Sequence, residues 1–224
     1  MLADTSRNAP ATSGNPKLNG LLADYCAGTL SPPLHALVAT HLMLRPDNRS
    51  YVAGLEALRA SNALDRATPN EIHQRDARLR AIFDSSPRPA NTLKPRDGSL
   101  PLPLQRLVGG DVEALRWRRI LPGVKEYQLG DIGGGQEACF YLIRGGKKMP
   151  AHTHGGDEVT LVLKGAFADT SGIYGQGDIC IADEAIDHTP TAVPGEDCLC
   201  FAVTDAPLKL TGPIGRYWNY FSKK

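Results

Sequence analysis

The chain has 224 residues and carries 25 lysines plus arginines against 24 aspartates plus glutamates, a formal net charge of +1. This length allows one large domain or two small ones that bury a core without disulfides, and the balanced charge argues against direct nucleic-acid binding through a broad basic face. No apolar run reaches the ~18 residues of a membrane span. The first fifteen residues lack the basic and apolar regions of a signal peptide. We therefore expect a cytoplasmic protein that does not enter a membrane.

The first part of the chain has a helical period. A helix over Leu18–Ala27 is expected to end at Gly28 in a left-handed cap. A second begins after Ser31, because Pro32 and Pro33 are tolerated in a first helical turn, and its apolar face includes His41. A third is expected over residues 49–62 and a fourth from a Thr68/Glu71 capping box. The apolar stripes of these last two helices are Val52, Leu55, Leu58 and Ile72, Leu79, Ile82, Phe83.

Five prolines interrupt residues 85–103, which we interpret as a linker. Beyond it the apolar period changes to two and glycines become frequent, as is typical of antiparallel sheets. The expected strands are Lys125–Leu129, Glu137–Ile143, Glu158–Leu163, Asp178–Ala182 and Cys198–Val203. The sequence thus predicts an α+β protein in which a small helical bundle (16–84) precedes an antiparallel β-barrel (104–216).

Three histidines and a glutamate in the strand-rich part form a candidate metal site. His152 and His154 are two positions apart and share a face of an extended chain, and Glu158 joins them if the strand continues beyond Gly155 and Gly156. His188 comes from a different strand and can close the coordination sphere. Three imidazoles and one carboxylate suit a divalent first-row metal, so we expect His152, His154, Glu158 and His188 to bind one ion.

The spacing from Gly146 through the first three of these residues to Gly165 resembles the first sequence motif of the cupin barrels. The second cupin motif is matched by Gly177-Asp178 and His188. Its usual Pro, Gly and Asn are replaced here by Asp183, Ala185 and Ala192.

Further segments of the sequence resemble the ChrR family of anti-sigma factors. The matching stretches are residues 21–30, 37–42, 115–119, 158–167, 194–200 and 203–207. The resemblance implies a cupin, double-stranded β-helix fold for residues 104–216. It also implies that residues 16–84 form an anti-sigma domain, which binds a sigma factor of the extracytoplasmic-function type. The metal-bearing cupin part would then release that sigma factor under oxidative stress.

One motif of that family is missing. The family's helical domain binds zinc through an upstream histidine and a His-x3-Cys-x2-Cys motif. His41 matches the motif's histidine, but Arg45 and Asn48 occupy the cysteine positions and cannot replace zinc-bound thiolates. We therefore expect no zinc in the helical part, with His41 packed or partly exposed and apolar packing in the place of the metal.

The five cysteines are odd in number and include no Cys-x-x-Cys pair, so neither disulfides nor a zinc ribbon are indicated. Cys198 and Cys200 share a strand face. They are interpreted either as oxidisable thiols near the metal or as small buried hydrophobic residues.

Three functions stay open from the sequence. The first is a metal-binding ChrR-like transcriptional regulator that senses an oxidant or a small ligand. The second is a metal-dependent cupin enzyme, a dioxygenase or an isomerase, for which no catalytic residue is identified. The third is a storage or scaffold cupin. Zinc is the expected metal, with iron, manganese and nickel as alternatives, and a homodimer is left open.

Overall fold

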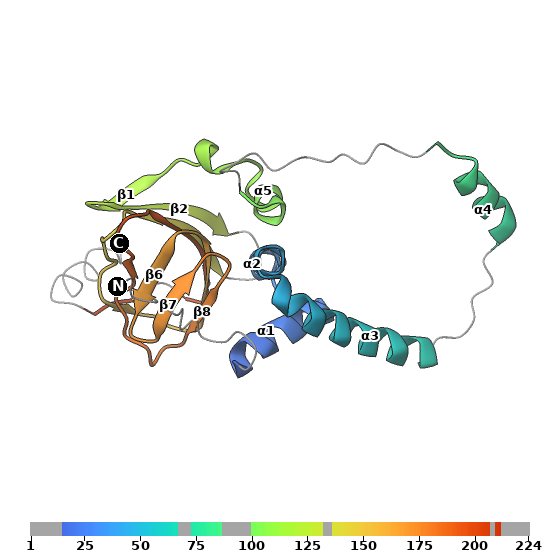
Figure 1. Ribbon diagram of the computed structural model, residues 1–224, viewed down its shortest axis with the longest axis horizontal. Coiled ribbons are helices and arrows are strands. Elements are labelled where there is room, and N and C mark those ends of the chain that lie inside the picture. The colour runs from blue at the N-terminus through green and yellow to red at the C-terminus, as the bar shows by residue number, and fades with distance from the viewer. Residues whose placement is uncertain (1–14, 67–72, 87–99, 132–135, 207–208, 212–224) are drawn as a thin grey trace, which may run out of the picture.

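The computed structural model describes residues 15–66, 73–86, 100–131, 136–206 and 209–211 (Figure 1). The helices of this part are α1 (Pro16–Ala27), α2 (Pro32–Leu44), α3 (Arg49–Arg66), α4 (Arg75–Phe83) and α5 (Leu102–Val108). Short 3-10 turns cover Pro46–Asn48 and Val112–Ala114. None of the described helices is long and apolar enough to cross a bilayer.

The strands follow the helices and are antiparallel. They are β1 (Arg118–Leu121), β2 (Val124–Asp131), β3 (Glu137–Ile143), β4 (His152–Thr153), β5 (Glu158–Lys164), β6 (Ala166–Asp169), β7 (Gly172–Gly175), β8 (Ile179–Ala182), β9 (Thr191–Ala192), β10 (Cys198–Thr204) and β11 (Lys209–Leu210). A six-stranded sheet has the order β1-β2-β3-β10-β5-β8, a three-stranded sheet the order β7-β6-β9, and β11 pairs with β4. All five expected strands are found, within two residues at each end.

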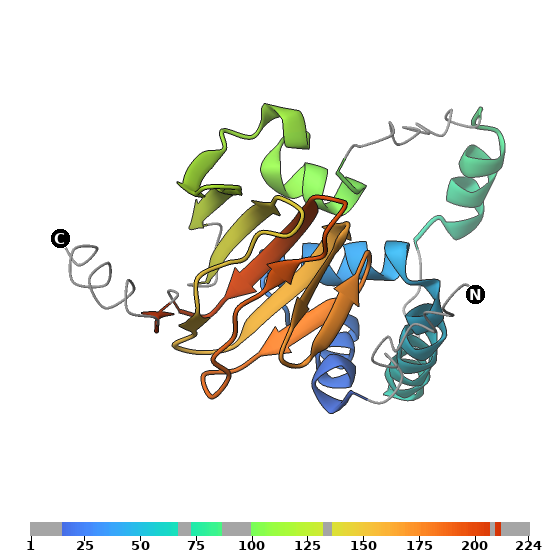
Figure 2. The ribbon, with the colours of Figure 1, turned by 60° about the vertical axis from the view of Figure 1, so that its left-hand side comes forward.

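The antiparallel cupin architecture is confirmed, and the barrel is not closed: the described strands pair as three separate sheets. Figure 2 shows the two larger sheets facing each other. The physical reason is that the strands near the predicted ligands are short, since β4 and β9 have two residues each. Beside these short strands the described residues form two isolated bridges, Lys148 with Thr191 and His152 with His188.

The central strands β5 and β10 of the six-stranded sheet are buried on both faces, whereas the edge strand β1 is largely exposed. Alternate residues of a strand point to opposite faces. In β5, Val159, Leu161 and Leu163 pack toward the helices, in one core with Phe140 and Phe201. The inner face, which meets the three-stranded sheet, forms a second core. This inner core contains Val124, Ile143, Met149, Val162, Phe167, Tyr174, Cys180, Ala192, Cys198 and Cys200.

Helices α1 and α2 lie on the outer face of the six-stranded sheet. Helix α2 contacts β5, β10 and α5, and α1 contacts β8. Helix α1 begins two residues before the expected start, at an Asn15 cap, and ends as predicted at Gly28 with φ +73°. Ser31 precedes α2, and its hydroxyl makes no cap hydrogen bond but donates to Gln136, the residue before β3.

The C-terminal end of α2 is fastened to the turn before β8. The ring of His41 is fully buried, its Nδ1–H donates to the carbonyl of Gly177 (2.7 Å), and Asn48 Nδ2 donates to its Nε2 (2.8 Å). Arg45 forms an ion pair with Asp178, which is buried. His41, Arg45 and Asn48, the three positions of the missing zinc motif, therefore hold α2 and the following turn against the cupin.

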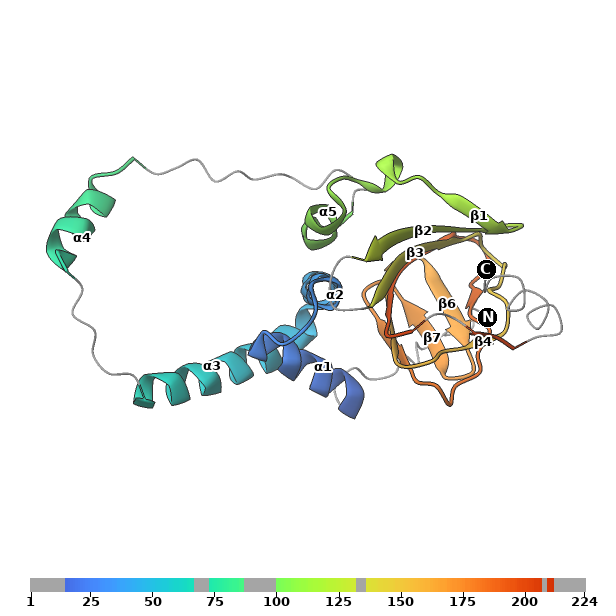
Figure 3. The same cartoon turned by 180° about the vertical axis from the view of Figure 1, so that it is seen from behind.

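The expected packing of the fourth helix is wrong. Helix α4 has no buried residue, and Leu79, Ile82 and Phe83 are 37%, 64% and 82% exposed. In Figures 1 and 3, α3 extends away from the sheets and α4 stands apart from the other helices. The apolar stripe of α4 thus has no counterpart surface among the described residues. Ile72 and the Thr68/Glu71 capping box lie outside the described residues.

Candidate metal centre

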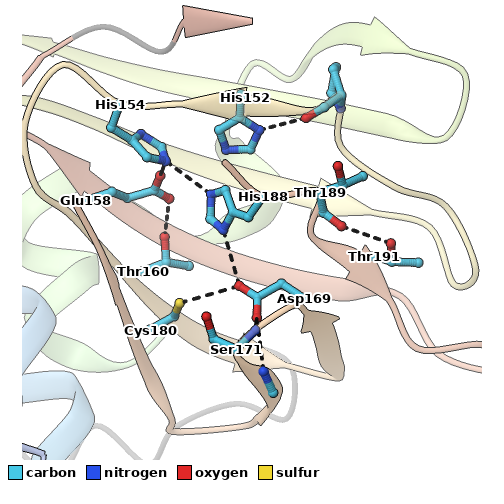
Figure 4. A network of polar contacts seen from close by, with 12 residues as sticks. His152, His154, Glu158, Thr160, Asp169, Ser171, Cys180, His188, Thr189 and Thr191 are labelled. Atoms are coloured by element: carbon cyan, nitrogen blue, oxygen red, sulfur yellow. Dashed lines mark hydrogen bonds and ion pairs between the residues drawn. The ribbon is translucent and has the colours of Figure 1, made fainter. Parts of the chain in front are cut away.

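The four predicted ligands come together at one end of the space between the two larger sheets (Figure 4). All four are buried, and each offers a donor atom that lies within 4.8 Å of the others. An ion held at about 2.0–2.2 Å by each ligand keeps its donors within about 4.4 Å of one another. The cluster in the structure is thus close to the size that a bound ion requires.

Local strand geometry explains how residues so far apart meet. His152 and His188 form an antiparallel bridge in which each backbone N–H donates to the other's carbonyl, at 3.1 and 3.0 Å. Glu158 opens β5, and its parity places it with Thr160 and Val162 on the inner face. His154 lies four residues before Glu158, and its Nε2 is 2.6 Å from Glu158 Oε2.

Two of the rings have outer hydrogen bonds that turn their Nε2 atoms inward. His152 Nδ1–H donates to the carbonyl of Pro150 (2.7 Å), and His188 Nδ1–H donates to Asp169 Oδ2 (3.2 Å). His188 Nε2 and His154 Nε2 face each other at 3.1 Å, while His154 Nδ1 is buried without a hydrogen-bond partner among the described residues. Three imidazoles that converge beside a carboxylate provide the donor set of a divalent metal, so these residues fit such an ion.

Burial and partner groups set the protonation of the cluster. Burial lowers the pKa of His152 to about 4, which keeps this imidazole neutral and available as a ligand. Burial opposes ionisation of Glu158, but hydrogen bonds from His154 and from the Thr160 hydroxyl (2.5 Å) outweigh it and hold the pKa of Glu158 below its ordinary value. The carboxylate is thus ionised, as metal binding requires.

Asp169 is a buried polar residue of this centre that the sequence did not single out. Burial opposes its ionisation, but the hydrogen bonds with His188 and the backbone of Ser171 keep the pKa of Asp169 below its ordinary value. It ends β6, a strand that is not among the five expected from the sequence. Asp169 lies two positions after the buried Phe167, so both side chains point to the same face of an extended chain. This spacing could have identified Asp169 from the sequence.

A small cavity of about 30 Å³ borders the cluster. Such a space accommodates roughly one or two molecules the size of water. Its lining is largely apolar and contains Tyr141, Ile143, Met149, His152, Glu158, Thr160, Phe167, Cys180, Ala182, His188, Pro190 and Cys200.

The two thiols of the Cys-x-Cys sequence face the interior on the same side of β10. Cys198 and Cys200 are buried, and their sulfur atoms are 3.4 Å apart. The hydrogen bond with Cys198, in which the Cys200 thiol is the donor, acts together with burial to raise the pKa of Cys200 well above its ordinary value. Cys200 is thus a protonated thiol, packed as a small apolar side chain at the edge of the cavity.

Comparison with known proteins gives the relationships of the chain. Residues 105–207 match the family described as the ChrR cupin-like domain. The chain is 40% identical to the anti-sigma-E factor ChrR of Cereibacter sphaeroides over 85% of this chain and 89% of that protein. It is also similar to a chain in the crystal structure of Rhodobacter sphaeroides SigE in complex with the anti-sigma ChrR, with 38% identity, a TM-score of 0.69, and coverage of 84% of this chain and 96% of that one. The chain therefore belongs to the ChrR family.

Proposed function

We propose that this chain is an anti-sigma factor whose helices bind a sigma factor of the extracytoplasmic-function type. In this proposal the cupin part holds one divalent metal and responds to an oxidant or a small ligand. The observation that carries it is the 40% identity to an anti-sigma factor, which extends over both the helices and the cupin. Because sigma factors act with RNA polymerase inside the cell, this function implies a cytoplasmic location.

The surface of the helices supports a protein partner. Large apolar side chains are exposed on α2, α3 and α4, whereas a monomeric surface helix normally turns its apolar stripe to a core. These residues are Met43, Tyr51, Leu58, Leu64, Leu79, Ile82 and Phe83. In α3, Val52 is buried in the core, whereas Leu58 and Leu64 are more than 60% exposed. The part of α3 beyond Val52 thus offers apolar side chains that a partner could cover.

Co-purification tests the partner. Tagged protein expressed in its native host is expected to retain a sigma factor, and the Ile82→Asp/Phe83→Asp variant is expected to lose most of it, because a partner cannot bury two new carboxylates. Ile173→Asp is the matched control, since Ile173 is 57% exposed on the cupin. Wild-type protein that retains no sigma factor would contradict the proposal.

We further propose that His152, His154, Glu158 and His188 hold the metal, and that it is zinc, with iron, manganese and nickel as alternatives. The convergence of these four residues and the inward Nε2 atom of His188 support the proposal. When bound, the ion supplies Lewis acidity and an open coordination position for a small ligand. The helical part is proposed to hold no zinc, since Arg45 and Asn48 contact Asp178 and His41 there.

Metal analysis of the protein from its native host tests this centre. One equivalent of a divalent metal per chain is expected, and His188→Ala should reduce it strongly while His41→Gln should not. Two equivalents of zinc in the wild-type protein would contradict a metal-free helical part, and no metal at all would contradict the proposed ligands.

A further inference from the structure

Asp169 links the β6–β7 turn to the proposed metal centre without being one of the candidate ligands. Its side chain is 1% exposed, and it lies behind His188 as seen from the cluster (Figure 4). A buried carboxylate is costly unless its oxygens are satisfied. What each oxygen contacts therefore indicates why the residue is there.

The two oxygens of Asp169 have separate partners. Oδ1 accepts hydrogen bonds from the backbone N–H groups of Ser171 (2.7 Å) and Gly172 (3.2 Å), which closes the turn between β6 and β7. Oδ2 accepts from His188 Nδ1 (3.2 Å), and the Cys180 thiol lies 4.0 Å from the same oxygen. The turn thus fixes the carboxylate through one oxygen and leaves the other to hold the ring of His188.

The contact with Oδ2 determines which nitrogen of His188 carries the proton. An ionised carboxylate only accepts hydrogen bonds, so His188 must present Nδ1–H to it. A neutral imidazole has a single N–H, and Nε2 is then left with a lone pair directed at His154 Nε2, 3.1 Å away. Such outer hydrogen bonds commonly fix the tautomer and orientation of a metal-binding histidine.

We propose that Asp169 is a positioning residue of the metal centre, which holds His188 as the Nδ1–H tautomer with Nε2 free to bind the ion. The proposal rests on the proposed metal site. Of the described residues, Asp169 is the one side chain that makes such an outer contact to a candidate ligand ring. His152 uses the backbone carbonyl of Pro150, and His154 Nδ1 has no hydrogen-bond partner within the described part of the chain. A side-chain substitution can therefore remove the outer contact of His188 and of no other ring in the cluster.

Asp169→Asn is the most informative substitution because it replaces one carboxylate oxygen by an amide nitrogen and keeps the shape of the side chain. In either orientation, the amide nitrogen faces a hydrogen-bond donor, either in the β6–β7 turn or on His188. If the amide oxygen keeps the turn, the amide N–H group meets His188 Nδ1 and drives the proton to Nε2, facing the metal. If the amide turns around, its N–H group meets the backbone N–H donors of Ser171 and Gly172. We expect the zinc dissociation constant, measured by competition with a chelator, to rise about 10- to 100-fold.

Asp187→Asn is the matched control. Asp187 adjoins His188 in sequence, but its carboxylate accepts from the exposed Thr211 hydroxyl at 2.9 Å, outside the cluster. Zinc affinity of this variant should stay within about twofold of the wild type, since ordinary surface contacts have small effects. An Asp169→Asn protein that binds zinc as tightly as Asp187→Asn would overturn the proposal.

A double-mutant cycle separates positioning of His188 from general support of the fold. If Asp169 acts through His188, Asp169→Asn should weaken zinc binding strongly in the wild-type background and hardly at all in a His188→Ala background. A loss of equal size in both backgrounds indicates a structural role and rejects the proposal.

A measurement on the unsubstituted protein covers the case in which Asp169→Asn does not fold. The tautomer of His188 can be read from nitrogen chemical shifts of zinc-free protein labelled at histidine, with the signal identified by its loss in His188→Ala. The Nδ1–H form is expected, and an Nε2–H form overturns the proposal. If the wild-type protein takes up no zinc, the metal site fails as a proposal, whereas the tautomer still decides the role of Asp169.

Discussion

His41 shows how one residue can keep its place in a family motif and have different contacts. The resemblance aligns it with a zinc ligand, yet its ring contacts Gly177 and Asn48. Its burial could be expected from its position on the apolar stripe of α2. Its partner could not, because Gly177 lies 136 positions away in sequence and no local period reports such a contact.

Protonation of His41 gives a prediction about acid stability. Burial lowers the pKa of His41 below its ordinary value of 6.5, so the unfolded chain takes up a proton that the folded chain rejects. The contribution of His41 to the free energy of unfolding is therefore complete above about pH 6.5 and decreases as the pH falls below that value. At pH 5.5 the decrease amounts to at most about 1.4 kcal/mol. Urea unfolding at pH 7.5 and 5.5, with a chelator present, measures this loss.

The variant His41→Gln should show a smaller drop in unfolding free energy between the two pH values than the wild type. His35→Gln is the control, because His35 is an exposed residue whose ring packs at a tilt against Tyr25 of α1. An unchanged pH dependence in His41→Gln would show that other groups account for the acid sensitivity.

At the scale of elements, the turn before β8 packs directly against the end of α2. Gly177 has φ +86°, and a Cβ atom there would lie 2.9 Å from Arg45 Cγ and 3.0 Å from Leu44 Cβ. Gly177→Ala should therefore add a steric conflict with the end of α2 to the strain of a left-handed backbone. The expected loss of unfolding free energy is about 2–4 kcal/mol.

Gly109→Ala is the matched comparison for this substitution. Gly109 ends α5 with φ +71°, but nothing lies within 4 Å of its Cβ position. Its replacement should cost only the backbone strain, about 1–2 kcal/mol. Equal losses in the two variants, measured by denaturant unfolding, would contradict close packing of α2 against this turn.

The ion pair in the same contact predicts a second difference in stability. Asp178 has a side chain 6% exposed, so Arg45→Met leaves a buried carboxylate with its partner removed. Because Arg45 is itself 32% exposed, water replaces part of the interaction, and we expect a loss of about 1–3 kcal/mol.

The pair Lys164–Glu196 is the reference for that measurement. Its side chains are 64% and 59% exposed, so Lys164→Met should change the unfolding free energy by no more than about 0.5 kcal/mol. A small effect in both variants would show that the Arg45–Asp178 pair contributes as little as an ordinary surface pair.

Helices and strands could be predicted from the sequence wherever their periodic apolar face is buried against another part of the same chain. The alternating strands and the grouping of His152, His154, Glu158 and His188 followed from periods of two and from motif spacing. Helix α4 shows the limit of this reasoning. Its apolar residues Leu79, Ile82 and Phe83 are exposed, and a stripe of this kind looks the same in a sequence whether it faces a core or a partner. Asp169 was missed because β6 has only four residues, too short for a reliable alternation.

At the scale of the whole molecule, the helices and the cupin share one hydrophobic core. Leu22, Leu37 and Val38 of α1 and α2 pack in the same cluster as Phe140 and Phe201 of the sheet. The two parts distinguished in the sequence are thus continuous in the structure, although the prolines between them mark a real change in composition.

This shared core predicts how the helices behave alone. A fragment of residues 15–86 loses the sheet that covers its apolar faces, and isolated helices of this length are marginal in water. Its circular dichroism should show little helix at 25 °C and no cooperative thermal transition, in contrast to the full chain. A fragment that unfolds cooperatively would show that the helices are stable without the cupin.

Strand β5 has a consequence for how this sequence can change. Its odd-numbered residues Val159, Leu161 and Leu163 support the helices, whereas Glu158 and Thr160 face the opposite side, toward the candidate metal cluster. Substitutions can alter one set without the other, but deletion or insertion of a single residue within the strand exchanges the two sides. The carboxylate would then press into the helix-facing core, and a leucine into the cluster. Changes of length in this family should accordingly be absent from β5 and concentrate in the turns between strands.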